Sequence, residues 1–171
     1  ETIYEYFVNS TTGEWEKWKP PTWTYPEGKK LNFSNLLVPT MDSTRAQHII
    51  RTIHRQKGAV LVVGAEGTAK TSTQLMFLAQ QDPNTMLTKR INFSSATTPG
   101  MAQYAIEAEL DKRGGKNFGP PNGKKMTIFF DDVSMPEVNK WGDQTTLELV
   151  RLAIEYGGFY FLDKDKRGDF K

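Results

Sequence analysis

Two short stretches of this sequence contain the residue types that bind phosphate and magnesium. The first is Gly64 to Ser72, which reads Gly-Ala-Glu-Gly-Thr-Ala-Lys-Thr-Ser and follows the apolar run 59–63. The second is Asp131-Asp132, which follows the apolar run 126–130. A glycine-containing loop between a strand and a helix presents backbone N–H donors to phosphate, and a Lys-Thr pair can follow them. The first stretch therefore predicts a phosphate-binding P-loop.

Each residue type in this loop has a chemical reason to be there. Lys70 is expected to reach the β- and γ-phosphates of a nucleotide, and the Thr71 hydroxyl is expected to bind Mg²⁺. Gly64 and Gly67 permit sharp turns that side chains would block. The backbone N–H groups of residues 65–72 supply the remaining donors. The predicted nucleotide-binding residues of the loop are Gly64, Glu66, Gly67, Thr68, Ala69, Lys70, Thr71 and Ser72.

Ala69 departs from the usual pattern G-x-x-x-x-G-K-[ST], which has a second glycine at this position. If φ there is positive, alanine costs on the order of 1 kcal/mol relative to glycine. If φ is helical, alanine costs little and favours the start of the helix. We expect the helical conformation, because Ala69 directly precedes the lysine that begins the helix.

The two aspartates have the arrangement of a Walker B motif, in which four apolar residues are followed by acidic residues. Mg²⁺ prefers oxygen ligands and often takes one or two carboxylates together with phosphates and water. Asp131 is therefore predicted to hold the Mg²⁺ shell, directly or through water. Asp132 is the predicted catalytic residue, at the position where a glutamate commonly polarises the attacking water in ATPases. Its side chain is about one methylene shorter than that of glutamate.

The elements that must position these residues alternate between strands and helices. Strands are predicted over 59–63, 90–94 and 126–130, and helical periodicity predicts helices over 71–80, 97–113 and 144–155. This order predicts an α/β fold with a mostly parallel sheet, whose ligand lies at the carboxyl ends of the strands. The residues expected to face the core of the last two helices are Met101, Tyr104, Ala105, Ala108, Leu147, Val150 and Ile154.

Outside these elements the sequence predicts smaller features. The segments 3–8 and 14–18 flank turn-forming residues and predict a β-hairpin. Thr40 and Asp42 can cap a helix over 43–55, whose apolar face is expected to hold Ala46, Ile49, Ile50 and Ile53. Residues 114–123 read as a loop, 133–143 as irregular, and 159–162 as the start of a hairpin.

Composition sets limits on the class of protein. The chain has 171 residues, a formal net charge of +2 and no cysteine. That length fits one domain, and we divide it into a hairpin and linker segment at 1–35 and a P-loop core at 36–171. The charge gives no reason to expect a nucleic-acid or membrane partner, and disulfides and thiolate metal sites are excluded. Because the sequence lacks an initial methionine and ends without a terminating element, we expect it to be part of a longer protein.

Several motifs together resemble the dynein heavy chains, and most closely the third AAA+ module of axonemal, outer-arm-type chains. These motifs are the P-loop at 64–71, Ile-Asn-Phe-Ser-Ser-Ala-Thr-Thr at 91–98, Phe-Gly-Pro-Pro-Asn-Gly-Lys-Lys at 118–125 and Phe-Asp-Asp-Val-Ser-Met-Pro at 130–136. Trp-Gly-Asp-Gln at 141–144 and Gly-Phe-Tyr at 158–160 extend the likeness over nearly the whole chain.

The resemblance implies an AAA+ large subdomain of a P-loop NTPase that binds ATP or ADP with Mg²⁺. In such modules the segment matching Leu37, Val38 and Pro39 packs near the adenine. Implied partners are the neighbouring AAA+ modules of the same heavy chain and, indirectly, microtubules and other dynein subunits. The implied location is the cytoplasm and cytoskeleton, within the axoneme of a cilium or flagellum.

The resemblance also implies a regulatory rather than a rapidly hydrolysing module. The third module usually gates the main site of the first, and its sensor residues and small helical subdomain would follow residue 171. We therefore expect the chain alone to bind nucleotide weakly and hydrolyse it negligibly. Two alternatives stay open at this point: a stand-alone P-loop enzyme such as a small kinase, and a non-catalytic scaffold with a decayed P-loop, for which Ala69 is the best support.

Overall fold

The computed structural model describes residues 2–25, 36–115, 117–160 and 169–170. The chain divides into two compact units, Glu1–Gln80 and Gln81–Lys171, which are described in turn. The first unit contains the predicted P-loop, and the second contains Asp131 and Asp132. The domain boundary near residue 35 stays a prediction. Among the described residues, no helix is both long enough and apolar enough to cross a membrane.

The first unit begins with the predicted hairpin. A short 3₁₀ turn, η1 (Ile3–Glu5), leads into β1 (Tyr6–Val8), which pairs antiparallel with β2 (Trp15–Lys17). Gly13 in the connecting turn has φ +73°, a conformation that glycine adopts without steric cost. The rings of Phe7 and Trp18 stack with centroids 4.5 Å apart, and Trp18 also meets His48 edge-on at 5.1 Å. These aromatic contacts join the hairpin to the helix that follows.

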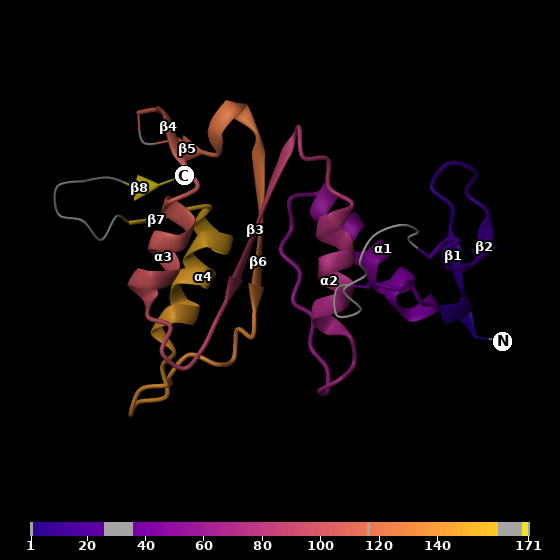
Figure 1. Ribbon diagram of the computed structural model, residues 1–171, viewed down its shortest axis with the longest axis horizontal. Coiled ribbons are helices and arrows are strands. Elements are labelled where there is room, and N and C mark those ends of the chain that lie inside the picture. The colour runs from indigo at the N-terminus through magenta and orange to yellow at the C-terminus, as the bar shows by residue number, and fades with distance from the viewer. Residues whose placement is uncertain (1, 26–35, 116, 161–168, 171) are drawn as a thin grey trace. The chain divides into compact units, whose positions relative to one another are not determined.

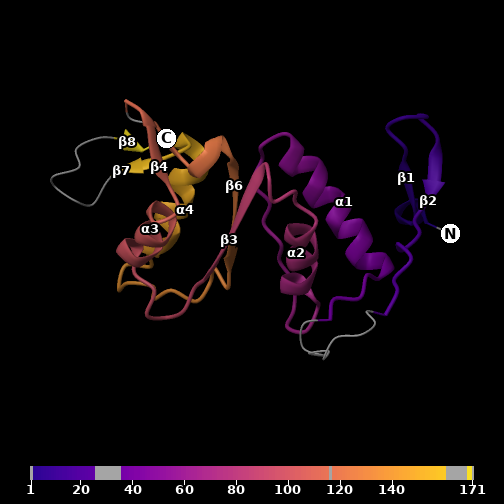
Figure 2. The same ribbon diagram turned by 45° about the horizontal axis from the view of Figure 1, so that its top comes forward.

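Two helices pack against each other in the first unit, α1 (Met41–Arg55) and α2 (Lys70–Ala79) (Figure 2). The predicted cap of α1 is confirmed at Thr40, whose hydroxyl oxygen accepts a hydrogen bond from the Ser43 N–H at 3.2 Å. Asp42 lies inside the first turn instead. The buried face of α1 differs from the predicted one: it contains Ile50 but is otherwise polar, with Ser43 and Gln47.

The predicted strand over residues 59–63 is wrong. This segment forms no strand, and the residues Leu61 and Val63 are 73% and 82% exposed. A strand is stabilised when its N–H and C=O groups pair with a neighbouring strand. None of the residues described pairs with 59–63, so the apolar composition alone does not produce a strand here.

The second unit is built around two parallel strands, β3 (Met86–Asn92) and β6 (Lys125–Asp131) (Figure 1). The predicted strand 126–130 is confirmed, with β6 extending one residue further at each end. The predicted strand 90–94 is confirmed only over 90–92, because β3 begins at Met86 and ends at Asn92. The helices α3 (Pro99–Glu107) and α4 (Thr145–Tyr156) cover one face of this strand pair. The core between them consists of Ile91, Phe93, Ala102, Ile106, Leu149, Val150 and Phe159.

The predicted core faces of α3 and α4 are only partly right, and in α3 the predicted residue Ala105 packs partly buried against the core. Met101 and Tyr104 are exposed, with Tyr104 at 73%, and α3 buries Ala102, Gln103 and Ile106 instead. In α4 only Val150 is buried as expected, whereas Leu147 and Ile154 are exposed. Each helix has two rows of apolar residues that are offset by about one position. Periodicity alone cannot tell which row is buried, because that depends on how the helix packs against the strands.

The region between α3 and β6 also differs from the prediction. The helix expected to reach Arg113 ends at Glu107, and β4 (Asp111–Gly114) pairs antiparallel with β5 (Asn117–Gly119). The 3₁₀ turn η3 (Pro121–Gly123) follows, where a loop is expected. The Arg113 guanidinium donates hydrogen bonds to the carbonyl oxygens of Pro120, at 3.0 Å, and of Lys124. Arg113 thus ties β4 to the backbone on both sides of η3.

The last elements agree with the sequence. Residues 133–143 form turns and bends, and α4 ends at Gly157, whose φ of +64° is the usual left-handed helix terminus. Beyond it, β7 (Phe159–Tyr160) pairs antiparallel with β8 (Asp169–Phe170), which confirms the predicted hairpin. The predicted strand residues 161 and 162 lie outside the described residues.

Candidate functional site

The predicted P-loop leads directly into α2, a helix of ten residues whose first residue is Lys70. Two glycines have clear steric roles in the loop. Gly67 has φ +72°, and a Cβ added to Gly64 would lie 3.1 Å from the Thr68 hydroxyl and 3.7 Å from Lys70 Cδ. Gly64 therefore leaves room for the Thr68 hydroxyl, which an added Cβ would crowd, and Gly67 makes the turn. Glu66 and Thr68 are exposed on the loop.

Ala69 corrects one of our expectations. Its backbone has φ +58° and ψ +26°, which is the left-handed and not the right-handed helical region. This is the conformation that the usual glycine adopts freely, and an L-residue with a Cβ occupies it at a cost of about 1–2 kcal/mol. Ala69 is also the N-cap of α2 and provides no side-chain hydrogen bond to the first turn. A bound anion is one way to satisfy the N–H groups at such a helix start.

Lys70 lies across the loop rather than away from it. Its ammonium nitrogen Nζ donates hydrogen bonds to the carbonyl oxygens of Gly64, at 2.8 Å, and Ala65, at 2.6 Å. The Thr68 hydroxyl donates to the same Ala65 carbonyl at 2.7 Å. Positive charge is therefore fixed over the loop next to the N-terminus of α2, where the helix dipole also favours an anion. Thr71 and Ser72 follow in the first turn of α2, and both are half-buried.

The two aspartates of the second unit have different surroundings. Asp131 is the last residue of β6, and its Oδ2 accepts a hydrogen bond from Arg90 Nη2 at 2.7 Å. Its backbone carbonyl accepts from the Phe93 N–H, which extends the ladder past the end of β3. Asp132 is exposed and has φ +55°, so the chain turns sharply where the strand ends. Both aspartates were predicted from the sequence, whereas Arg90, the partner of Asp131, was not.

The segment after the aspartates is irregular but well connected. Asn139 Oδ1 accepts hydrogen bonds from the N–H groups of Trp141 and Asp143, both at 2.9 Å. Gln144 Nε2 donates to the Pro136 carbonyl at 2.6 Å. Hydrogen bonds between side-chain amides and the backbone therefore hold this segment in the absence of regular secondary structure. The Trp-Gly-Asp-Gln motif at 141–144 lies at the end of this segment, directly before α4.

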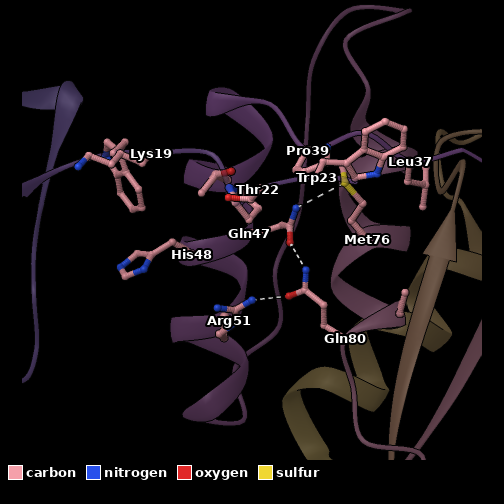
Figure 3. A pocket seen from close by; sticks show the side chains of 14 residues that line it. Lys19, Thr22, Trp23, Leu37, Pro39, Gln47, His48, Arg51, Met76 and Gln80 are labelled. Atoms are coloured by element: carbon pink, nitrogen blue, oxygen red, sulfur yellow. Dashed lines mark hydrogen bonds between the residues drawn. The ribbon is translucent and has the colours of Figure 1, made fainter. Parts of the chain in front are cut away.

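The predicted adenine-contacting segment, Leu37 to Pro39, borders a cavity of about 580 Å³ in the first unit (Figure 3). Leu37 and Pro39 line it, and Val38 is half exposed. A chain of hydrogen bonds crosses one wall: Arg51 donates to Gln80, Gln80 Nε2 to Gln47 Oε1, and Gln47 Nε2 to Met76 Sδ. The other lining residues are Trp18, Lys19, Pro21, Thr22, Trp23, Thr44, His48 and Ala79.

The residues predicted to hold Mg²⁺ fit its chemistry. Thr71 offers a hydroxyl oxygen and Asp131 a carboxylate, which are the hard oxygen donors that Mg²⁺ selects. Within the described residues, no group of three or more His, Cys, Asp or Glu side chains could hold a metal ion. Mg²⁺ at nucleotide sites does not need such a cluster, because phosphate oxygens and water complete its shell.

Comparison with known proteins identifies the family. The sequence model of the family described as the P-loop containing dynein motor region matches residues 25–170. This chain belongs to that family. The dynein gamma chain of the flagellar outer arm of Chlamydomonas reinhardtii is 45% identical over 174 residues, and human dynein axonemal heavy chain 8 is 46% identical over 172 residues. Human dynein axonemal heavy chain 10 is 34% identical over 165 residues.

These relatives are far longer than the chain. The alignments cover 100%, 99% and 96% of this dynein-family chain, respectively, but only 4% of each relative. The resemblance to axonemal dynein heavy chains and the P-loop α/β fold are both confirmed. The family also implies that this module binds nucleotide and forms one part of a larger motor chain.

Proposed function

We propose that this dynein-family chain is a regulatory AAA+ module, the third of its heavy chain, that binds ATP or ADP with Mg²⁺. The observation that carries the proposal is the loop at the start of α2. There Lys70 Nζ lies within hydrogen-bonding distance of two loop carbonyls, and the N-cap alanine leaves the first turn without a side-chain cap. A phosphate group would satisfy these N–H groups and neutralise the lysine.

Each predicted residue has a defined role in this proposal. Lys70 exchanges its carbonyl partners for β- and γ-phosphate oxygens, and the N–H groups of residues 65–72 surround the phosphates. Thr71 and Asp131 would hold Mg²⁺, which would help to neutralise the phosphate charge when bound. Leu37, Val38 and Pro39 contact the adenine, with support from the apolar lining that Leu37 and Pro39 give to the cavity.

Slow hydrolysis follows from the residue at the proposed catalytic position. Asp132 has a shorter side chain than glutamate and extends from a left-handed backbone position into solvent. A general base must come within about 3 Å of the attacking water or act through one more water. Asp132 therefore orients the attacking water poorly, and bound nucleotide is hydrolysed slowly. Such a site suits regulation of a main ATPase site elsewhere in the heavy chain.

The names of the relatives support the proposed setting. Several of them are flagellar or axonemal heavy chains, one of them from the outer arm. The partners that we propose are the neighbouring AAA+ modules of the same heavy chain and, through the whole motor, microtubules and other dynein subunits. The proposed location is the cytoskeleton of the cytoplasm and the axoneme of a cilium or flagellum.

The decisive experiment measures binding of a fluorescent ATP analogue to the purified chain, with and without Mg²⁺. Lys70→Ala is expected to weaken binding about tenfold or more, because it removes a charge-assisted contact to phosphate. Lys112→Ala is the matched control, since Lys112 is an exposed lysine of β4 outside the loop. Equal affinities of the two variants for the ATP analogue would refute nucleotide binding by this loop.

Turnover in the same samples separates the regulatory proposal from the alternatives. We expect little phosphate release from the wild-type chain. Rapid release that depends on Lys70 would refute slow hydrolysis and favour a stand-alone P-loop enzyme. Absence of nucleotide binding under all Mg²⁺ conditions would favour a scaffold with a decayed P-loop.

A further inference from the structure

Arg90 and Asp131 form an ion pair between the two parallel strands of the second unit. Arg90 Nη2 lies 2.7 Å from Asp131 Oδ2. The strand register places Arg90 beside Phe129 and Asn92 beside Asp131, and paired residues of parallel strands point to the same face. Ile91, by contrast, belongs to the core under α3 and α4. Arg90 and Asp131 therefore share the face that those two helices leave uncovered.

Two contacts hold the guanidinium of Arg90 in place. Besides its bond to Asp131, Arg90 Cζ lies 5.9 Å from the centroid of the Phe129 ring, a cation–π distance. The Asp131 side chain is 10% exposed and that of Arg90 is 41% exposed, so water screens the carboxylate much less than the arginine. The pair is thus an organised contact between adjacent strands and not a chance meeting of two solvated side chains.

The carboxylate in this pair is the one that a nucleotide-binding module would use for Mg²⁺. A guanidinium on one oxygen of Asp131 reduces the negative charge available to a divalent cation, and its own charge repels that cation at short range. Thr71 and the phosphates would supply the other ligands, but neither removes this repulsion. Nothing in the residue types alone reveals this effect, because Arg90 lies 41 positions before Asp131.

We propose that Arg90 competes with the divalent cation for Asp131 and so raises the Mg²⁺ concentration at which the site fills. The inference rests on the proposed metal role of Asp131. It makes Arg90 a residue that tunes metal affinity, since it touches neither nucleotide nor water in the proposed reaction. Where free Mg²⁺ is limiting, such a site would hold nucleotide without metal for part of the time, which suits a module that responds to its nucleotide state.

The test titrates Mn²⁺, an oxygen-seeking stand-in for Mg²⁺, into the nucleotide-free chain and follows free Mn²⁺ by electron paramagnetic resonance. Arg90→Gln removes the charge but keeps a hydrogen-bond donor, and we expect it to bind Mn²⁺ about tenfold more tightly than wild type. Arg90→Lys keeps a positive charge and is the matched control, expected to stay within about threefold of wild type. Arg90→Met is a second neutral variant in case Arg90→Gln does not fold.

Two further measurements complete the design. Adding Asp131→Asn to Arg90→Gln is expected to abolish the gain in Mn²⁺ binding. Unchanged or weaker Mn²⁺ binding in Arg90→Gln, or a gain that survives Asp131→Asn, would overturn the proposal. Binding of the fluorescent ATP analogue is measured separately in the same variants. A chain that gains Mn²⁺ affinity without binding nucleotide would contradict the proposed function while supporting the role of Arg90.

Discussion

Replacing Ala69 with glycine is predicted to stabilise the chain, although glycine is the poorest helix former after proline. The reason is the backbone conformation at the start of α2, where Ala69 has φ +58°. An alanine Cβ in the left-handed region crowds the following carbonyl oxygen and costs about 1–2 kcal/mol. Glycine has no Cβ and avoids this cost entirely.

The net stabilisation by Ala69→Gly is smaller than the strain energy that the substitution removes. Glycine has more conformational freedom in the unfolded chain, and this freedom offsets about 0.4–1 kcal/mol of the benefit. The net stabilisation is therefore about 0.5–1 kcal/mol. With an m value of about 2 kcal/mol/M, the urea midpoint should rise by roughly 0.2–0.5 M.

Urea unfolding followed by circular dichroism measures this shift, and Ala79→Gly is the matched control. Ala79 is an exposed residue at the last position of the same helix. Glycine there should lower the free energy of unfolding, by up to about 1 kcal/mol. Opposite signs for the two variants are the expected result. A fall in the urea midpoint of Ala69→Gly, equal to that of the control, would refute the left-handed assignment and restore the helical alternative.

Two further predictions concern the second unit. Gly119→Ala should destabilise the β4–β5 connection by about 1–2 kcal/mol, as measured by urea unfolding. The reason is that an added Cβ would lie 2.4 Å from Arg113 Nε and displace the guanidinium from its carbonyl partners. An unchanged urea midpoint would show that Arg113 moves aside freely. The pKa of Asp82 is lowered below its usual value of 3.8, first by the Asn84 backbone N–H and also by the side chains of Thr85 and Asn84. The charged form therefore stabilises the fold above pH 3.8, and this contribution is lost as the pH falls through the lowered pKa. Asp82→Asn should flatten that part of the acid unfolding profile, and a profile identical to wild type would contradict it.

The chemistry-bearing residues could be predicted because they follow local rules. The glycines and the Lys-Thr pair of the P-loop, and the aspartates at the end of an apolar run, are recognisable from spacing alone. The caps at Thr40 and Gly157 are equally local, because each depends on the few residues of one helix turn. Both strands of the β3–β6 pair were found for the same reason, and only their ends were misplaced.

The predictions that were wrong concerned features that depend on residues distant in the sequence. The apolar run at 59–63 predicts a strand, but a strand needs a neighbour, and the described residues provide none. The core stripe of α3 depends on which side meets the strands, and Ala102 and Ile106 were buried in place of Met101 and Tyr104. The conformation of Ala69 depended on the closure of the whole loop, in which Lys70 binds the Gly64 carbonyl.

The sequence by itself determined that this chain has a P-loop, a pair of strand-end aspartates and an α/β order of elements, because each is written in contiguous residues. Only the tertiary structure decided that Ala69 is left-handed and that Arg90 binds Asp131. The physical reason is the same in both cases. Both the strain at Ala69 and the ion pair between the strands arise only when separate segments are brought together. Strand register sets which residues of two strands meet, and no single segment contains that register.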